Sequence, residues 1–238
     1  MPESTPLPRC LYDLNVDAWE DGLYLARCRF DPAQMLDDAF SRAGVTEPER
    51  LRRAVAKRRC EYLAGRVCAT AAGAALTGDT LTPTLGDDRA PRWPAPLVGA
   101  ITHSNGRAAA LIGHRDRWQS LGLDHEAWLP PARAARLAGE ILTGEEHQAL
   151  EGLNDARRAA RITLTFSVKE SLFKALYPRT GQRFYFQDAA LIDERRIRLL
   201  TTLSPAWPAG AVLPFQWREE GDGLLSWIQV PVRQPARP

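Results

Sequence analysis

The chain has 238 residues, 45% of them hydrophobic, which is enough to bury the core of one large domain or of two small ones. Its 31 Lys and Arg residues and 29 Asp and Glu residues leave a formal charge of +2, which excludes the strongly basic balance of a general nucleic-acid binder. No apolar stretch reaches the roughly 20 residues of a membrane span, and the first residues, with Pro2 and Glu3, lack a secretory signal, so we expect a cytoplasmic protein.

The first half of the chain predicts a strand over residues 23–30 and a short helix over residues 32–43. A proline-free stretch rich in Ala, Arg and Leu then predicts a long helix over residues 49–76, ending near Gly78. Residues spaced four apart share one side of a helix. Arg58, Tyr62 and Arg66 therefore lie on one side of the predicted helix.

A proline-rich loop and a hairpin follow. Residues 86–96 contain three prolines, so they predict an ordered surface loop and no central strand. Apolar runs over residues 97–102 and 108–112 flank Asn105-Gly106, a strong turn signal, and predict a β-hairpin. His103 is expected where the first strand meets the turn.

A carboxylate pair is predicted in the second half of the chain. Residues 121–126 resemble a short strand, in which side chains alternate between faces. Asp124 and Glu126 would therefore point the same way and His125 the opposite way. The ordinary alternative is that the two carboxylates are only the solvated face of an edge strand.

Two sequences fit the capping-box pattern and predict helices, from Thr143 to about Leu153 and from Ser167 to about Tyr177. In the second helix Glu170 and Lys174 lie at i,i+4, which is also the spacing of a simple surface ion pair. Three more strands are expected, over residues 183–192, 197–203 and 224–232. The four cysteines show no CxxC spacing and favour small buried thiols.

Each feature has an ordinary explanation alone, but their order along the chain is informative. The motifs are Gly65-Arg66, Arg89-Ala-Pro-Arg-Trp-Pro94, Thr102-His103, Gly122-Leu-Asp-His-Glu126 and Phe166-Ser-Val-Lys-Glu-Ser-Leu-Phe-Lys174. This series closely resembles the Sfp-type 4′-phosphopantetheinyl transferases, in the siderophore-synthase branch typified by the D component of enterobactin synthase. His125 and Phe166 depart from the commonest family pattern, and neither departure removes a metal ligand.

The resemblance implies an α+β fold, a pseudo-dimer of two similar halves with antiparallel sheets. The halves would be residues 1–120, binding the nucleotide of coenzyme A, and residues 121–238, binding metal and carrying catalysis. We expect a monomer, because such a chain already contains both halves.

The reaction implied is transfer of the 4′-phosphopantetheine group from coenzyme A to a serine of an apo acyl, peptidyl or aryl carrier protein, releasing 3′,5′-ADP. The resemblance makes Asp124, Glu126 and Glu170 the ligands of Mg²⁺, a cation that prefers oxygen donors. It assigns Lys169 and Lys174 to the phosphates. It places four further residues around the nucleotide: Arg58, Arg66, Arg89 and His103. Thr102 belongs to the same motif as His103 and is expected at the same part of the site.

Several alternatives stay open. The base for the serine proton is Glu126 or a water molecule on the metal. Arg133, Arg136, Trp128 and Leu129 form part of the carrier-docking surface or only a loop leading into an exposed helix. A different Mg²⁺-dependent pyrophosphohydrolase or phosphotransferase would share the carboxylates and arginines, and an RNA-binding module built on residues 50–66 would need stronger charge and exposed aromatic side chains.

Overall fold

The computed structural model describes residues 6–232, which form two compact units. The first unit comprises the residues up to Gln119 together with Pro231 and Val232, and the second comprises residues 120–230. Pro2 and Glu3, on which the expected lack of a secretory signal depends, lie outside the described residues. Within residues 6–232, no helix has the length and apolar character needed to span a membrane.

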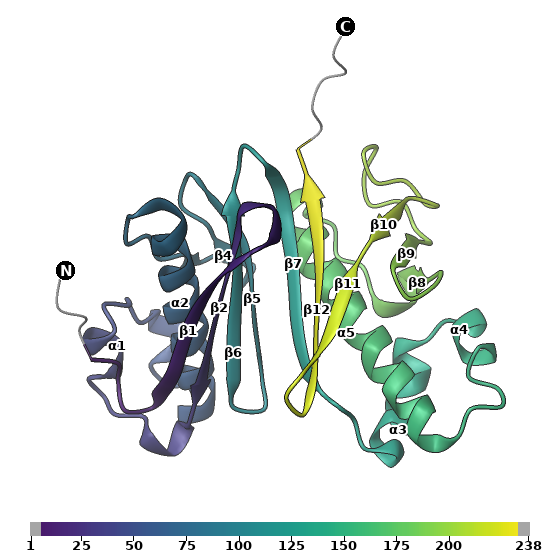
Figure 1. The fold of residues 1–238 in the computed structure, drawn as a ribbon, viewed down its shortest axis with the longest axis horizontal. Helices are drawn as coiled ribbons and strands as arrows, with labels where there is room; N and C mark the ends of the chain where they lie inside the picture. Colours follow the sequence, from purple (N-terminus) through teal and green to yellow (C-terminus); the bar gives the residue numbers. More distant parts are fainter. Residues whose placement is uncertain (1–5, 233–238) are drawn as a thin grey trace, which may run out of the picture. The chain divides into compact units, whose positions relative to one another are not determined.

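A four-stranded antiparallel sheet forms the first unit, in the order β1-β2-β6-β5 (Figure 1). Its strands are β1 (Leu11–Trp19), β2 (Leu23–Phe30), β5 (Leu97–Ser104) and β6 (Arg107–His114). The predicted strands are present, but β1 was not expected. Most of its side chains are exposed, and Asp13 has a positive φ of 54° at an irregularity between Tyr12 and Asn15, so β1 lacks a clean alternation of apolar residues.

The long helix α2 (Ala56–Thr77) packs against β2 and β6 and ends at Gly78, whose φ is 83°. It starts later than predicted, because Val55 is extended and residues Glu49–Leu51 form the separate short helix η3. A close approach holds α2 to β5: a Cβ on Gly65 would lie 2.7 Å from Cγ2 of Ile101. This glycine brings the helix close to the strand that carries Thr102 and His103.

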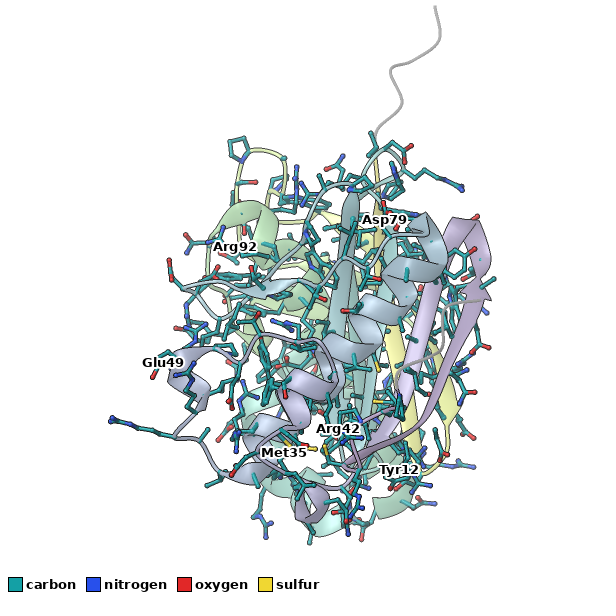
Figure 2. The ribbon with its side chains drawn as sticks, turned by 90° about the vertical axis from the view of Figure 1, so that its left-hand side faces the viewer. Tyr12, Met35, Arg42, Glu49, Asp79 and Arg92 are labelled. Carbon is teal, nitrogen blue, oxygen red and sulfur yellow. The ribbon has the colours of Figure 1, made fainter. Side chains whose placement is uncertain are left out.

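The helix predicted over residues 32–43 is wrong, because the chain forms two short helices, η2 (Pro32–Gln34) and α1 (Ala39–Arg42). Met35 is extended between them, and its sulfur lies 3.6 Å from that of Cys10. Figure 2 shows Met35 and Arg42 on this side of the first unit. All four cysteines are buried free thiols, as expected. A further short helix, η1 (Glu20–Gly22), joins β1 to β2.

The predicted hairpin is present but its turn is tighter. Asn105 and Gly106 alone form it, with φ values of 47° and 73°, the positive values that a two-residue type I′ turn requires. His103 therefore pairs within β5, opposite Ala108. The proline-rich loop holds a small hairpin of β3 (Thr84–Leu85) and β4 (Pro91–Arg92), with Arg92 labelled in Figure 2.

Two three-stranded sheets form the β structure of the second unit, in the orders β11-β12-β7 and β10-β9-β8. The first contains β7 (Trp118–Ala127), β11 (Gln216–Glu220) and β12 (Gly223–Pro231). The second contains β8 (Ala189–Leu191), β9 (Arg196–Leu199) and β10 (Val212–Pro214). The sequence missed β10 and β11 and made β8 too long, since Phe186–Asp188 form the short helix η4.

Three helices complete the second unit: α3 (Pro131–Ile141), α4 (Gly144–Gln148) and α5 (Asp155–Thr180). The capping box of Thr143 and Glu146 is confirmed, although α4 ends at Gln148. The capping box predicted at Ser167 is wrong, because Asn154 caps α5 and Ser167 lies buried inside the helix, 2.8 Å from the hydroxyl of Ser226. Pro178 does not stop α5, which continues to Thr180.

Candidate active site

Gly122 fixes how closely α5 lies against β7. A Cβ at this position would lie 1.9 Å from the backbone oxygen of Ser171, so only glycine fits. Three residues further along α5, Lys174 donates a hydrogen bond of 2.7 Å from Nζ to Oδ1 of Asp124. Asp124 itself is only 3% exposed. The glycine of the Gly-x-Asp-x-Glu sequence is therefore a packing residue that brings the lysine to the aspartate.

Glu170 joins this acidic cluster from one turn earlier in α5. Burial raises the pKa of Glu170, the ammonium of Lys174 lowers it, and the charge of Asp124 raises it. Two carboxylates and one lysine therefore interact electrostatically. Within residues 6–232, no three His, Cys, Asp or Glu side chains lie close enough to hold a metal ion. The three-carboxylate site stays a prediction.

Glu126 lies two residues beyond Asp124 on β7 and is half-buried. A Cβ on Gly223 would lie 2.1 Å from the backbone oxygen of Glu126, so this glycine allows β12 to begin directly against the end of β7. His125 is buried on the alternate side of the strand. The alternation predicted for residues 124–126 therefore places both carboxylates on one face of β7.

The cluster fits a hard divalent cation. Mg²⁺ takes carboxylate oxygens, and one or two such ligands suffice when substrate phosphates and water complete its octahedron. Burial raises the pKa of Glu170, and the charge of Asp124 adds to this effect, so a bound cation would favour the ionised form of Glu170. The donor set is therefore appropriate for the predicted ion.

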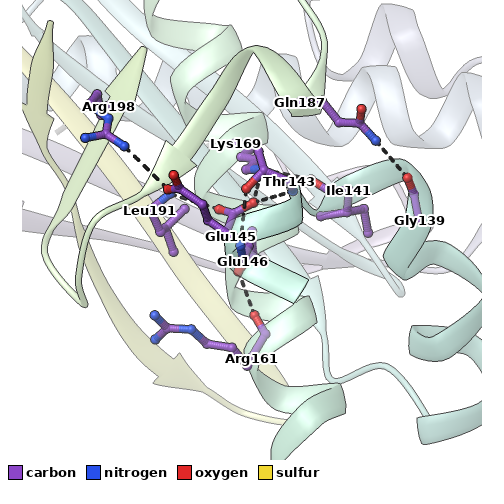
Figure 3. Close-up of polar contacts among 11 residues, drawn as sticks. Gly139, Ile141, Thr143, Glu145, Glu146, Arg161, Lys169, Gln187, Leu191 and Arg198 are labelled. Carbon is purple, nitrogen blue, oxygen red and sulfur yellow. Dashed lines mark hydrogen bonds and ion pairs between the residues drawn. The ribbon is translucent and has the colours of Figure 1, made fainter. Parts of the chain in front are cut away.

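The structure gives Lys169 different surroundings from those expected. Its ammonium is 2.6 Å from Oε2 of Glu146 and donates a 2.8 Å hydrogen bond to the carbonyl of Ile141 (Figure 3). Lys169 is 2% exposed, and burial lowers its pKa while Glu146 raises it. A phosphate would have to displace buried contacts to reach this ammonium, whereas Lys174 is more exposed.

A pocket of about 250 Å³ adjoins Glu170, and the sequence did not indicate it. Phe173 of α5 forms one part of its wall, with its ring 5.0 Å from that of Tyr177 and 5.4 Å from that of Phe184. Helix α5 also contributes Lys169 and Glu170, and the rest of the lining comes from the segment that leads into β8 and from the first residue of that strand: Arg183, Phe184, Tyr185, Phe186 and Ala189. The one signal of this pocket in the sequence is the run of three aromatic residues at 184–186, which the motifs did not include.

In the first unit, Arg58 and His103 lie together. Nη1 of Arg58 is 3.4 Å from Nε2 of His103, which brings the end of β5 beside α2. Glu61, which the sequence did not single out, has Oε2 at 3.5 Å from Nη1 of Arg58 and 3.9 Å from Nδ1 of His103. A carboxylate thus touches both predicted nucleotide ligands, and only tertiary structure could bring it there.

Arg66 is a buried cation, 5% exposed, with its guanidinium 4.3 Å from the centre of the Tyr62 ring. One nitrogen donates a 3.3 Å hydrogen bond to the carbonyl of Thr84, and the buried Nε atom has no hydrogen-bond partner. Burial lowers the pKa of Arg66, Tyr62 raises it and the charge of Arg58 lowers it further. An anion bound here would satisfy Nε and offset two like charges.

Thr102 and Arg89 differ in their surroundings. Thr102 is buried on β5 and points away from His103, its neighbour on the strand. Arg89 is exposed between β3 and β4 with a φ of 71°, and its amide donates to the carbonyl of Gly86. The contact of Arg66 with Thr84 holds the hairpin that carries Arg89. The first unit therefore gathers Arg58, Arg66 and His103 around α2 and leaves Arg89 on a loop.

The second unit thus holds a lysine beside two carboxylates, and the first unit holds arginines beside a histidine. Side chains of these kinds can bind a cation or phosphate groups. Residues 47–113 match the 4′-phosphopantetheinyl transferase N-terminal domain, and residues 120–221 match the 4′-phosphopantetheinyl transferase superfamily. The chain belongs to this superfamily.

Individual relatives agree. Enterobactin synthase component D of Salmonella typhi is 32% identical over 79% of this chain and 78% of that protein. The component D of Salmonella typhimurium is 38% identical with the same coverage. The 4′-phosphopantetheinyl transferase Npt of Nocardia iowensis is 29% identical over 78% of this chain and 82% of its own length. The chain is an enzyme that transfers phosphopantetheine, with coenzyme A as substrate, to carrier proteins.

Proposed function

We propose that Asp124, Glu126 and Glu170 hold Mg²⁺ and that Lys174 contacts the pyrophosphate of coenzyme A. The observation that supports this most strongly is the 2.7 Å contact of Lys174 with buried Asp124, together with the raised pKa of Glu170, which burial and the charge of Asp124 both raise. Mg²⁺ supplies positive charge that offsets the negative charge of the phosphates. Lys169 is left out of the phosphate contacts because its ammonium is engaged with Glu146.

The reaction forms one bond and breaks one. The hydroxyl oxygen of the carrier serine attacks the phosphorus that bears the pantetheine arm. The bond from that phosphorus to the bridging oxygen breaks, and 3′,5′-ADP leaves with the bonding electron pair. Lys174 stabilises the developing negative charge, and Glu126, half-buried at the end of β7, accepts the serine proton.

In the first unit, Arg66, Arg58 and His103 bind the phosphates at the nucleotide end of coenzyme A, while Thr102 shapes the strand beneath them. The unsatisfied Nε atom and buried position of Arg66 support this role, because a buried cation gains from a charge-assisted hydrogen bond. Arg89, on its exposed loop, makes an outer contact with the nucleotide. Residues 1–120 therefore serve nucleotide binding and residues 121–238 serve metal binding and catalysis.

The aromatic pocket beside Glu170 receives the pantetheine arm. This arm is a chain of amides and methylenes without charge, so it suits a wall of aromatic side chains better than bulk solvent. Glu170 belongs both to the pocket lining and to the acidic cluster, so the two lie side by side. This arrangement suits coenzyme A, because its uncharged arm is bonded directly to the reacting phosphate. Phe173, Phe184 and Tyr185 are the aromatic residues that we assign to the arm.

The protein partner is an apo acyl, peptidyl or aryl carrier protein, and the enterobactin synthase relatives favour a siderophore pathway. Arg133 and Arg136 are exposed on α3, next to the half-buried Trp128 and Leu129, and they suit an acidic carrier. The enzyme works as a monomer in the cytoplasm. A sedimentation measurement that showed a stable trimer would contradict the proposed monomeric state.

Coenzyme A consumption with and without a carrier tests the reaction class. Apo aryl, peptidyl and acyl carriers are each offered with Mg²⁺, and 3′,5′-ADP is quantified. The proposal expects one 3′,5′-ADP per carrier modified and none when the carrier serine is replaced by alanine. Release of 3′,5′-ADP without any carrier would instead identify a pyrophosphohydrolase.

A further inference from the structure

One carboxylate, Glu146, connects three elements of the second unit (Figure 3). Its Oε2 accepts hydrogen bonds of 2.9 Å from the amide of Thr143 and 2.6 Å from the ammonium of Lys169. Its Oε1 accepts a 2.9 Å hydrogen bond from the amide of Leu191. The side chain thus joins the start of α4 to helix α5 and to strand β8.

These connections meet at the aromatic pocket. One side of the pocket is α5, from which Lys169 and Glu170 contribute adjacent residues. The rest of the lining comes from residues 183–186 and from Ala189, the first residue of β8. Glu146 contacts α5 through Lys169 and β8 through Leu191, so a single carboxylate links the two parts of the pocket lining.

The pair is buried, with side-chain exposures of 2% for Lys169 and 9% for Glu146. A buried ion pair commonly adds little net stability, because removing two charges from water costs about as much as their attraction returns. We therefore expect the ion pair to contribute mainly by fixing the positions of the elements that it joins. Lys169 also donates to the carbonyl of Ile141, so the ammonium is held between two fixed acceptors.

We propose that Glu146 and Lys169 are positioning residues, which hold Glu170 and the pocket in the geometry that binds the pantetheine arm. This proposal rests on the function proposed above. It differs from a phosphate contact by Lys169 in what it predicts for two ligands, because 3′,5′-ADP carries the nucleotide phosphates but lacks the arm.

The test is calorimetric titration of Glu146→Gln/Lys169→Met with coenzyme A and, separately, with 3′,5′-ADP, both with Mg²⁺. Removing both charges together avoids leaving one of them buried alone. The dissociation constant for coenzyme A should rise by about tenfold, the size of loss typical when supporting contacts are removed, and that for 3′,5′-ADP should not change. Arg161→Met/Glu194→Gln removes an ion pair of the same unit and should bind both ligands like the wild type.

Glu146→Asp provides a second variant if the double variant does not fold, since it keeps the charge and shortens the reach by one methylene. It should show a smaller loss with the same selectivity for coenzyme A. Equal losses for both ligands would show that Lys169 binds phosphate, and no loss for either would show that the pair has no positioning role. Both results overturn the proposal. Failure of the wild type to modify any carrier would contradict the proposed function instead. The titrations would still test the positioning role, because they measure ligand binding and not transfer.

Discussion

Lys174 and Asp124 form the contact on which the acidic cluster depends. Replacing Lys174 by glutamine removes the ammonium that stabilises the leaving oxygen, and we expect transfer to slow by about 100-fold or more. Because Asp124 is buried, the folded state should also lose about 2 kcal/mol. Rates on an apo carrier and urea unfolding measure the two effects. Lys57→Gln, on the exposed start of α2, is the matched control, and equal losses in both variants would contradict the role of Lys174.

The raised pKa of Glu170 predicts how stability depends on pH. The folded state holds the proton of Glu170 more tightly than the unfolded state does. The stability contributed by this protonation is fully present below the unfolded pKa and is lost as pH rises through the folded pKa. Without divalent cation, wild type should therefore gain stability relative to Glu170→Gln as pH falls toward the ordinary glutamate value of 4.5. Thermal melts of both proteins across pH measure this gain.

Added Mg²⁺ should reverse this balance by binding the ionised carboxylate. The melting temperature of the wild type should rise with Mg²⁺ more at neutral than at acid pH, and that of Glu170→Gln should respond less. A pH dependence identical in the two proteins would show that Glu170 titrates as it does in the unfolded chain.

Asp124, Glu170 and Lys174 were all predicted from the sequence to belong to one site, and the fold does bring them together. The i,i+4 spacing fixed the relation of Glu170 to Lys174, and strand alternation fixed that of Asp124 to Glu126. Local periodicity carries no information on partners distant in sequence. Glu61 at His103 and Glu146 at Lys169 could not be predicted for this reason.

Gly122 determines the position of α5 on β7. In Gly122→Ala the new methyl group would lie 1.9 Å from a backbone oxygen that cannot move without shifting the helix. We expect a loss of more than about 3 kcal/mol in the free energy of unfolding, together with loss of transfer activity. Chemical denaturation measures the first effect.

Gly139→Ala is the matched control, because Gly139 lies in α3 and a Cβ there meets nothing within 4 Å. Alanine favours a helix over glycine, so this variant should gain up to about 1 kcal/mol. If Gly122→Ala unfolded no more easily than Gly139→Ala, the close approach of α5 to β7 would not constrain the site.

At the level of elements, the errors of prediction have two causes. The pattern at Ser167 satisfied a local capping rule, but the chain buries Ser167 against Ser226 and begins α5 at Asp155, after the cap at Asn154. Tertiary packing outweighed a local hydrogen-bond preference worth about 1 kcal/mol. Strand β1 was missed for the opposite reason, because an exposed edge strand lacks the apolar alternation that would reveal it.

At the level of the whole molecule, the chain contains two units that each pack a long helix against β structure. The α+β fold and its antiparallel sheets followed from the family resemblance more than from any periodicity. Superfamily matches extend over residues 47–113 and 120–221, so both units contribute to the assignment. The roles proposed for the two units depend on different residue sets and can be tested separately.

The most direct test is intact-mass analysis of an apo aryl carrier protein incubated with the enzyme, coenzyme A and Mg²⁺. The proposed function predicts a mass gain of one phosphopantetheine group on every carrier molecule, absent with Glu170→Ala and absent when the cation is chelated. Glu219→Ala, an exposed glutamate of β11, should modify the carrier at the wild-type rate. Full modification by Glu170→Ala would contradict the assignment of the acidic cluster, and no modification of aryl, peptidyl or acyl carriers by the wild type would contradict the transferase itself.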